Sequence, residues 1–353
     1  MKRFISVVLL LGISISGILF GSEVKLIEPA EAIRLVGNKS VIFVSGDSNE
    51  TYTKNHIIGS VEMYADNLYQ PDVVGDMQCY KKALLYIQSK GIKNNQMIIT
   101  YDNFYGSNAA AVHSFFESLG HKEIRVLNGG VESIRRLDPN QQVYDKLKAQ
   151  REMIKKDIVV AQKEGRVDEV EKFNCKIEGI TAKMDMLEPK LLVQCGKEEI
   201  HKKSDYQLDP TKFNVKYIAD KDEVKKAIED IIENGESSRF IIIDTCNKEE
   251  IAGEEKIDNV LQHRETPKVK FIEWRDITDI EKKRSFKSLK EMQQIFDKEG
   301  ISRDQTIYVY CRSSVGSSSH VSSALRLLGY EKVKLFTGSC RALSSDMNLS
   351  IER

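Results

Sequence analysis

The chain has 353 residues, and its 53 Lys and Arg residues balance 53 Asp and Glu residues, so the formal net charge is zero. A composition that is 41% hydrophobic excludes a disordered or collagen-like chain, and this length is enough for two ordinary domains and an additional segment. Since neither sign of charge is in excess, the composition favours neither an anionic membrane nor nucleic acid as partner, and we predict no nucleic-acid binding.

The chain begins with a segment typical of export signals. Lys2 and Arg3 precede an apolar run over residues 4–20, and Gly21 and Ser22 are small enough for a cleavage site. We therefore predict a signal peptide over residues 1–22 and a periplasmic location, with membrane anchoring as the alternative if the segment is not cleaved. The six cysteines stand singly at positions 79, 175, 195, 246, 311 and 340 with no CxxC pair, so we predict no structural metal site and no cofactor.

An internal repeat organises the rest of the sequence. Residues 91–130 align without a gap to residues 300–339, with identical residues such as Tyr101 and Tyr310. Both copies contain a short apolar strand, a loop of small residues, a helix closed by Gly120 or Gly329, and a second strand. This is the order of a βαβ unit, which predicts a parallel sheet.

Each copy also has an earlier strand with an amphipathic helix before it. The strands are residues 41–44 (VIFV) and 240–244 (FIIID), and the helices are expected near residues 29–35 and 222–232. We therefore predict two α/β domains, at residues 23–138 and 207–353, each with a mostly parallel sheet flanked by helices.

Residues 139–206, between the two domains, follow a different pattern. Apolar residues recur at alternating spacings of three and four from Val170 to Leu191, and the same rhythm runs upstream from Tyr144 to Ala161. The break at residues 164–166 predicts two helices folded back as an antiparallel coiled-coil hairpin, followed by a linker. Such a hairpin could be a plain spacer, or it could serve self-association or the docking of a protein partner.

Cys311 is the candidate nucleophile. It ends the strand TIYVY and opens a loop of small residues, Arg312, Ser313, Ser314, Val315, Gly316 and Ser317, that leads into a helix. Backbone N–H groups in such a loop, together with the helix dipole, stabilise an anion. A thiolate is such an anion, so this position favours a reactive Cys311 near neutral pH.

These motifs resemble tandem rhodaneses of the thiosulfate and 3-mercaptopyruvate sulfurtransferase type. The resemblance rests on YVYCRSSVGS and LLGYEKVKLFTGS in the second copy, and on HIIGS and LGHKEIRVLNGG in the first. It implies an active second domain and an inactive first domain, where Asp102 occupies the position of Cys311. It also implies that Cys311 takes a sulfane sulfur from a small donor as a persulfide, which the loop N–H groups hold, and passes it to a thiol or cyanide.

The sequence departs from that family in the residues that would bind the donor. After Asp244 the family usually has two Arg residues, and here Cys246 and Glu250 stand in their places. An anionic donor such as thiosulfate should therefore bind weakly. Asp244, Cys246 and Trp274 are the other residues expected near the pocket, with a buried position in the core as the alternative for Cys246.

We therefore interpret the chain as a sulfurtransferase that uses Cys311. One alternative is a periplasmic sulfur carrier or scaffold that binds a sulfur-metabolising partner with little turnover. A third reading, a Cys-dependent phosphatase or arsenate reductase, is poorer because Ser317 stands where a phosphatase loop needs Arg. His320 is expected on the surface of its helix, and Cys340 in the core.

Overall fold

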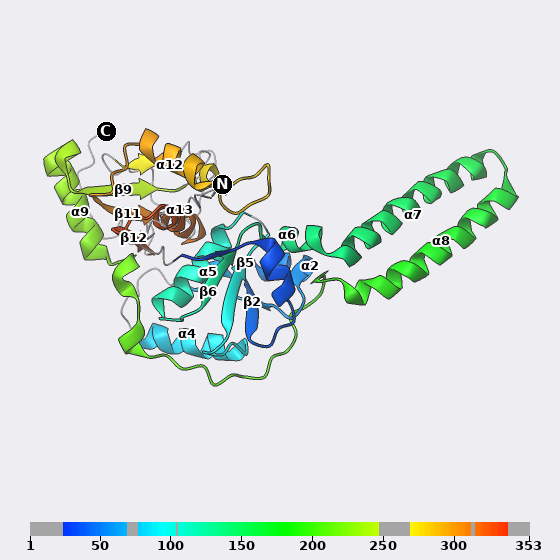
Figure 1. The fold of residues 1–353 in the computed structure, drawn as a ribbon, viewed down its shortest axis with the longest axis horizontal. Coiled ribbons are helices and arrows are strands. Elements are labelled where there is room, and N and C mark those ends of the chain that lie inside the picture. The colour runs from blue at the N-terminus through cyan, green and yellow to red at the C-terminus, as the bar shows by residue number, and fades with distance from the viewer. Residues whose placement is uncertain (1–23, 69–76, 104, 247–268, 312–314, 338–353) are drawn as a thin grey trace, which may run out of the picture.

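The computed structural model describes residues 24–68, 77–103, 105–246, 269–311 and 315–337. Two α/β domains lie against each other, and a long helical hairpin projects away from both of them (Figure 1). This is the predicted fold class: two parallel sheets flanked by helices, with a helical hairpin between them in the sequence.

The first domain contains a five-stranded sheet in the order β1-β6-β5-β2-β4, with every neighbouring pair parallel. Its strands are β1 (Leu26–Ile27), β2 (Val41–Ser45), β4 (Val61–Glu62), β5 (Met97–Tyr101) and β6 (Ile124–Leu127). Its helices are α1 (Pro29–Ala32), α2 (Asn49–Lys54), α3 (Ala65–Leu68), α4 (Met77–Ser89), α5 (Ser107–Ser118) and α6 (Gly130–Leu137). The central strand β5 leads through a short loop into α5, as the repeat predicts.

The second domain repeats this arrangement in the order β10-β9-β11-β12-β8, again entirely parallel. Its strands are β8 (Ile218–Ala219), β9 (Phe240–Asp244), β10 (Lys270–Phe271), β11 (Thr306–Tyr310) and β12 (Val333–Phe336). Its helices are α9 (Lys221–Asn234), α11 (Trp274–Ile277), α12 (Leu289–Lys298) and α13 (Val315–Leu327). Strands β9 and β11 therefore correspond to β2 and β5, and α13 corresponds to α5.

Local sequence signals set the limits of these elements. Asp220 and Glu223 form a capping box at the start of α9, and each satisfies a backbone N–H of the other. Gly120 and Gly329 follow α5 and α13 with φ of 74° and 81°, a left-handed conformation that residues with a Cβ rarely adopt. The β-branched run of β9 is buried after its first residue, as expected for a strand covered on both faces.

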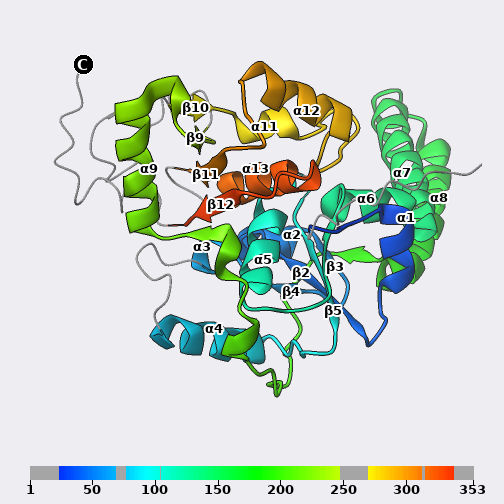
Figure 2. The ribbon, with the colours of Figure 1, turned by 60° about the vertical axis from the view of Figure 1, so that its left-hand side comes forward.

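The domains meet through α5 and α13, and Figure 2 shows α13 lying over α5. The facing surfaces consist largely of Ala, Ser and Gly, which allow close approach. A Cβ on Gly316 would lie 3.1 Å from Oδ1 of Asn108 and 3.3 Å from the backbone of Ser107. Near the other end of the two helices, Arg326 donates two hydrogen bonds to the Glu117 carboxylate, at 2.8 and 2.5 Å, in an almost fully buried pair.

The hairpin consists of α7 (Pro139–Lys163) and α8 (Val167–Leu187), whose bounds agree with the predicted break. Its seam is a separate apolar cluster of Ile154, Ile180 and Met184, against which other residues of the predicted stripe pack, among them Tyr144, Leu147, Ile158, Phe173 and Ile177. The hairpin therefore buries its apolar face within itself and does not depend on the domain cores for its own packing.

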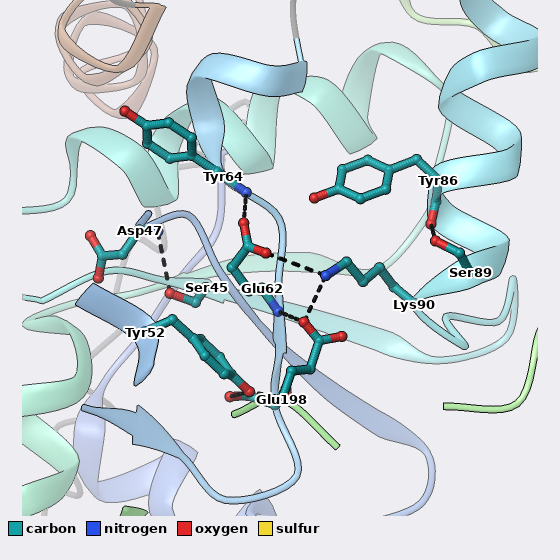
Figure 3. Close-up of polar contacts among 10 residues, drawn as sticks. Ser45, Asp47, Tyr52, Glu62, Tyr64, Tyr86, Ser89, Lys90 and Glu198 are labelled. Carbon is teal, nitrogen blue, oxygen red and sulfur yellow. Dashed lines mark hydrogen bonds and ion pairs between the residues drawn. The ribbon is translucent and has the colours of Figure 1, made fainter. Parts of the chain in front are cut away.

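The segment after the hairpin runs along the first domain. Strand β7 (Val193–Gln194) pairs antiparallel with β3 (His56–Ile57), and Tyr206 is buried in the core of the first domain. Figure 3 shows Lys90 between Glu62 and Glu198, with its Nζ 2.6 Å from an oxygen of Glu198 and 3.4 Å from one of Glu62. These contacts fix the linker onto the first domain.

Within the described part of the chain, no helix has both the length and the hydrophobicity that crossing a membrane requires. The predicted signal segment lies outside the described residues.

Replacing residues 141–190 by a two-residue linker should leave both domains folded. The two ends of this segment already meet, because the Asn140 side chain donates to the Lys190 carbonyl and the Asp138 carboxylate accepts the backbone N–H groups of Asn140 and Leu192. We expect the free energy of unfolding of the domains to change by no more than about 1 kcal/mol, as denaturant titration would measure.

Light scattering of the deleted and intact proteins measures whether the hairpin mediates self-association. A loss of mass beyond that of the deleted segment would mean that it does. Loss of the folded domains on deletion would contradict the independence of the hairpin.

Candidate active site

Cys311 lies at the carboxyl end of the central strand of the second sheet. It directly follows β11 and precedes α13, and only 3% of its surface is exposed. Val315, Gly316 and Ser317 form the first turn of α13, whereas Arg312, Ser313 and Ser314 lie outside the described residues. The sulfur is thus within a few residues of a helix N-terminus, where the backbone presents unsatisfied N–H groups and a partial positive charge.

The first domain shows what this strand-to-helix turn can do. Asp102 follows β5 as Cys311 follows β11, and its buried carboxylate accepts hydrogen bonds from three backbone N–H groups, those of Gly106 at 3.0 Å, Asn108 at 3.1 Å and Ala109 at 3.3 Å. The turn is therefore an anion cradle occupied by a side chain of the chain itself.

The gap-free repeat carries these donors over to the second domain. The residues at the positions of Gly106, Asn108 and Ala109 are Val315, Ser317 and Ser318. All three lie at the start of α13, which begins at Val315, and so are close to the partial positive charge of the helix N-terminus. We therefore expect them to stabilise negative charge on Cys311 or on a sulfur attached to it.

A second buried carboxyl group lies beside Asp102. Asp47 comes two residues after β2, its backbone N–H donates to the Ser45 hydroxyl (Figure 3), and its side chain accepts a hydrogen bond of 3.2 Å from the Asn108 amide. Burial, and then the negative charge of Asp102, raise the pKa of Asp47 from its ordinary 3.8 to about 7. Burial raises the pKa of Asp102 as well, but its three backbone N–H bonds counteract that shift, so of the two carboxyl groups we assign the proton to Asp47.

In the second domain Cys246 occupies the place of Asp47. It comes two residues after Asp244, the residue of β9 that pairs with Tyr310, just as Asp47 comes two residues after Ser45, which pairs with Tyr101. Cys246 is buried, which was the alternative expected for it from the sequence. Its Sγ lies 3.9 Å from the Sγ of Cys311. Each domain thus places two like side chains in one buried spot, carboxyls in the first and thiols in the second.

Asp244 binds both segments that carry this thiol pair through hydrogen bonds. Its carboxylate accepts a hydrogen bond of 3.0 Å from the Cys246 backbone N–H and one of 3.1 Å from the Tyr310 hydroxyl. The sequence predicted Asp244 and Cys246 as possible pocket residues, but it did not predict the contact between the two sulfurs. The sequence analysis did not single out Asp47. The equivalence of Asp47 and Cys246 becomes clear only from the strand pairing, because each residue follows the strand beside the central strand of its sheet.

His320 and Trp274 lie in surroundings that differ from those expected from the sequence. His320 was expected on a helix surface, and this is wrong, because its ring is fully buried, stacked on Phe286 and hydrogen-bonded to Thr278. Trp274 packs edge-on against Tyr105 of the first domain and against His320. The contact with Tyr105 places Trp274 at the domain interface. Glu250 and Cys340 lie outside the described residues.

Among the described residues, no group of three or more His, Cys, Asp or Glu side chains is arranged to hold a metal ion. The candidate reactive group at the described site is the Cys311 sulfur, and the N-terminus of α13 beside it is a source of positive potential.

Replacing Asp47 with Asn should flatten the dependence of stability on pH. A carboxyl whose pKa is raised in the folded state contributes stability that is fully present below its unfolded pKa and is lost as the pH rises through its folded pKa. The wild type should therefore lose on the order of 2–4 kcal/mol between about pH 4 and pH 7 through this group. Asp47→Asn should not show that loss in denaturant unfolding across this range.

The exposed Asp157 of the hairpin provides a matched control. Asp157→Asn should keep the pH slope of the wild type. An equal slope in Asp47→Asn and the wild type would contradict the shared-proton assignment.

Comparison with known proteins agrees with the architecture. A family model described as "Rhodanese-like domain" matches the chain twice, over residues 28–137 and 221–346. No curated protein sequence is significantly similar to the chain.

Solved structures of tandem rhodanese proteins resemble the whole chain. The 3-mercaptopyruvate sulfurtransferase SseA from Escherichia coli is 15% identical, with a TM-score of 0.59, 90% of this chain covered and 98% of that one. The sulfur transferase subunit of yeast mitochondrial complex I is 16% identical, with a TM-score of 0.63 and coverages of 93% and 99%. Tum1 from Saccharomyces cerevisiae is 14% identical, with a TM-score of 0.60 and coverages of 94% and 98%.

At these identities the structural likeness shows a shared fold, while the two family matches cover more than half of the chain and extend over both repeats. The protein therefore belongs to the rhodanese-like family and carries two copies of its domain.

Proposed function

We propose that this protein is a sulfurtransferase that carries a sulfane sulfur as a persulfide on Cys311 and passes it to a thiol or to cyanide. The observation that carries the proposal is the Asp102 carboxylate held by three N–H groups, with a thiol at the equivalent position of the second copy. The fold is shaped at this turn to hold an anion, and only the second domain provides a nucleophilic sulfur there.

The proposed reaction has two displacement steps at sulfur. The Cys311 thiolate attacks the sulfane sulfur of the donor, and the rest of the donor leaves as an anion. The terminal sulfur of the resulting persulfide is then attacked by the acceptor, and Cys311 leaves as a thiolate. Negative charge stays near the start of α13 throughout, so the N–H groups of the first helical turn, such as those of Val315 and Ser317, would stabilise both the thiolate and the persulfide.

The donor proposed for this site is a polysulfide or the persulfide of another protein. Cys246 occupies the place where related sequences have a donor-binding Arg, and a buried thiol provides no positive charge for a sulfonate or a carboxylate. The same lack of charge disfavours a phosphatase, because Ser317 stands where the phosphate would need an Arg.

A carrier or scaffold is the second candidate function, and the hairpin is the observation that favours it. Its helices project from the domains (Figure 1), and Met153, Val167 and Met186 are 67%, 74% and 68% exposed. Exposed apolar side chains on a projecting element suit contact with another protein or with a second copy. A carrier would load Cys311 once and turn over slowly with small acceptors, whereas an enzyme would turn over repeatedly.

We propose that this reaction takes place in the periplasm. Support comes from Lys2, Arg3 and the apolar run that follows them, which are typical of an export signal. If the segment is retained, it would anchor the protein to the membrane.

Cys311→Ser should abolish sulfur loading and transfer to cyanide. A serine hydroxyl cannot form a persulfide, and the rest of the cradle is unchanged. The measurement is peptide mass spectrometry after incubation with polysulfide, together with a thiocyanate assay for turnover.

Cys175→Ser and Cys195→Ser, which change exposed thiols, are the matched controls and should load as the wild type does. Cys79 should be dispensable as well. Persulfide at wild-type levels in the Cys311→Ser protein would show that the nucleophile lies elsewhere.

A further inference from the structure

Two thiols lie in contact at the carboxyl edge of the second sheet. Cys246 and Cys311 follow the neighbouring strands β9 and β11, and their Sγ atoms are 3.9 Å apart. Both residues are almost fully buried, at 1% and 3% exposure. The separation is that of a hydrogen-bonded thiol pair, since a disulfide bond would be about 2.05 Å long.

The backbone holds Cys246 firmly in this place. Its N–H donates to Asp244, and both the N–H and the hydroxyl of Thr245 donate to the carbonyl of Tyr310, each at 3.0 Å. Tyr310 directly precedes Cys311. These hydrogen bonds therefore fix the backbone of Cys246 beside that of Cys311, and the proximity of the two residues is a property of the strand pairing.

The electrostatics of the pair keep a proton on Cys246. The hydrogen bond to Cys311, then burial and the negative charges of Cys311 and Asp244, raise the pKa of Cys246. Cys246 is thus protonated and within hydrogen-bonding distance of Cys311, as Asp47 is the protonated member of the carboxyl pair in the first domain. A proton is available within contact distance of the reactive sulfur.

We propose that Cys246 is a resolving thiol, which attacks the persulfide of Cys311 and releases its sulfane sulfur as hydrosulfide. This inference rests on the proposed function, because it needs a persulfide on Cys311. It adds a route by which the bound sulfur leaves without any small-molecule acceptor.

The step balances within the two side chains and the bound sulfur. A bond forms between the sulfurs of Cys246 and Cys311, and the bond between the Cys311 sulfur and the sulfane sulfur breaks. The proton of Cys246 moves to the departing sulfur, which leaves as HS⁻ after accepting two electrons, one from each cysteine sulfur. The product is a Cys246–Cys311 disulfide, and an external dithiol returns it to two thiols by exchange, becoming a disulfide itself.

The required movement is small. The two sulfurs must approach from 3.9 Å to about 2.05 Å, and rotation about the Cα–Cβ bonds of the two cysteines displaces sulfur over this range. The strands on which the residues lie need not separate.

The test is a single turnover without acceptor. The full chain is loaded with polysulfide, freed rapidly of excess donor, and followed for released hydrosulfide, for the added sulfur on the Cys311 peptide, and for a Cys246–Cys311 disulfide by non-reducing peptide mapping. The wild type should release one hydrosulfide per loaded chain and form the disulfide. Cys246→Ser should keep its persulfide and release hydrosulfide at least about tenfold more slowly.

Cys175→Ser is the matched control, since it removes an exposed thiol on the hairpin and should behave as the wild type does. Cys246→Ala, which keeps the residue small and apolar, should match Cys246→Ser if the sulfur atom is what matters.

Equal persistence of the persulfide in the wild type and in Cys246→Ser, with no disulfide formed, would overturn the resolving role and leave the sulfurtransferase proposal intact. Failure of every variant to load sulfur on Cys311 would overturn the proposed function, and the resolving step with it.

Discussion

Three backbone N–H groups converge on one point where β5 turns into α5, and such a point favours a negative charge. The rest of the site depends on how each domain meets this requirement. In the first domain the carboxyl group of Asp102 fills the cradle and accepts hydrogen bonds from its three N–H groups. In the second domain the equivalent position is a sulfur, whose charge can be shared with an atom that arrives from outside.

The neighbouring strand then determines how that charge behaves. Two acidic groups that lie close together and away from water strongly disfavour two negative charges, so one of them holds a proton. Asp47 holds the proton beside Asp102, and Cys246 holds it beside Cys311. The duplicated fold thus has the same electrostatic arrangement twice, with oxygen chemistry in one copy and sulfur chemistry in the other. The oxygen pair can only exchange a proton, whereas the sulfur pair can also exchange electrons.

Much of this architecture could be predicted from the sequence, because local patterns carry it. The apolar runs and closing glycines of the repeat predicted both parallel sheets, and the alternating spacing from Tyr144 to Leu191 predicted the hairpin seam. The position of Cys311 between a strand and a small-residue loop gave the candidate nucleophile.

What the sequence did not reveal depends on contacts between distant segments. The proximity of Cys246 to Cys311 follows from the register of β9 against β11, and nothing in either segment alone encodes it. The prediction that His320 lies on the surface of its helix was wrong for a similar reason. A helix rich in Ser has the composition of a surface helix, yet α13 is covered by its own sheet on one side and by α5 on the other. The small side chains are there because the helices approach closely.

The attachment of the hairpin has an evolutionary consequence. Its two helices leave and rejoin the first domain at one place, where the Asp138 carboxylate holds residues from both ends. Its length is therefore not coupled to the geometry of either sheet. Insertion or loss of one heptad in each arm would preserve the apolar seam and would move the tip by about 10 Å. Homologues can thus differ in reach by whole heptads while the sulfur site keeps the same geometry, so the span of the arm can adapt to its surroundings independently of catalysis.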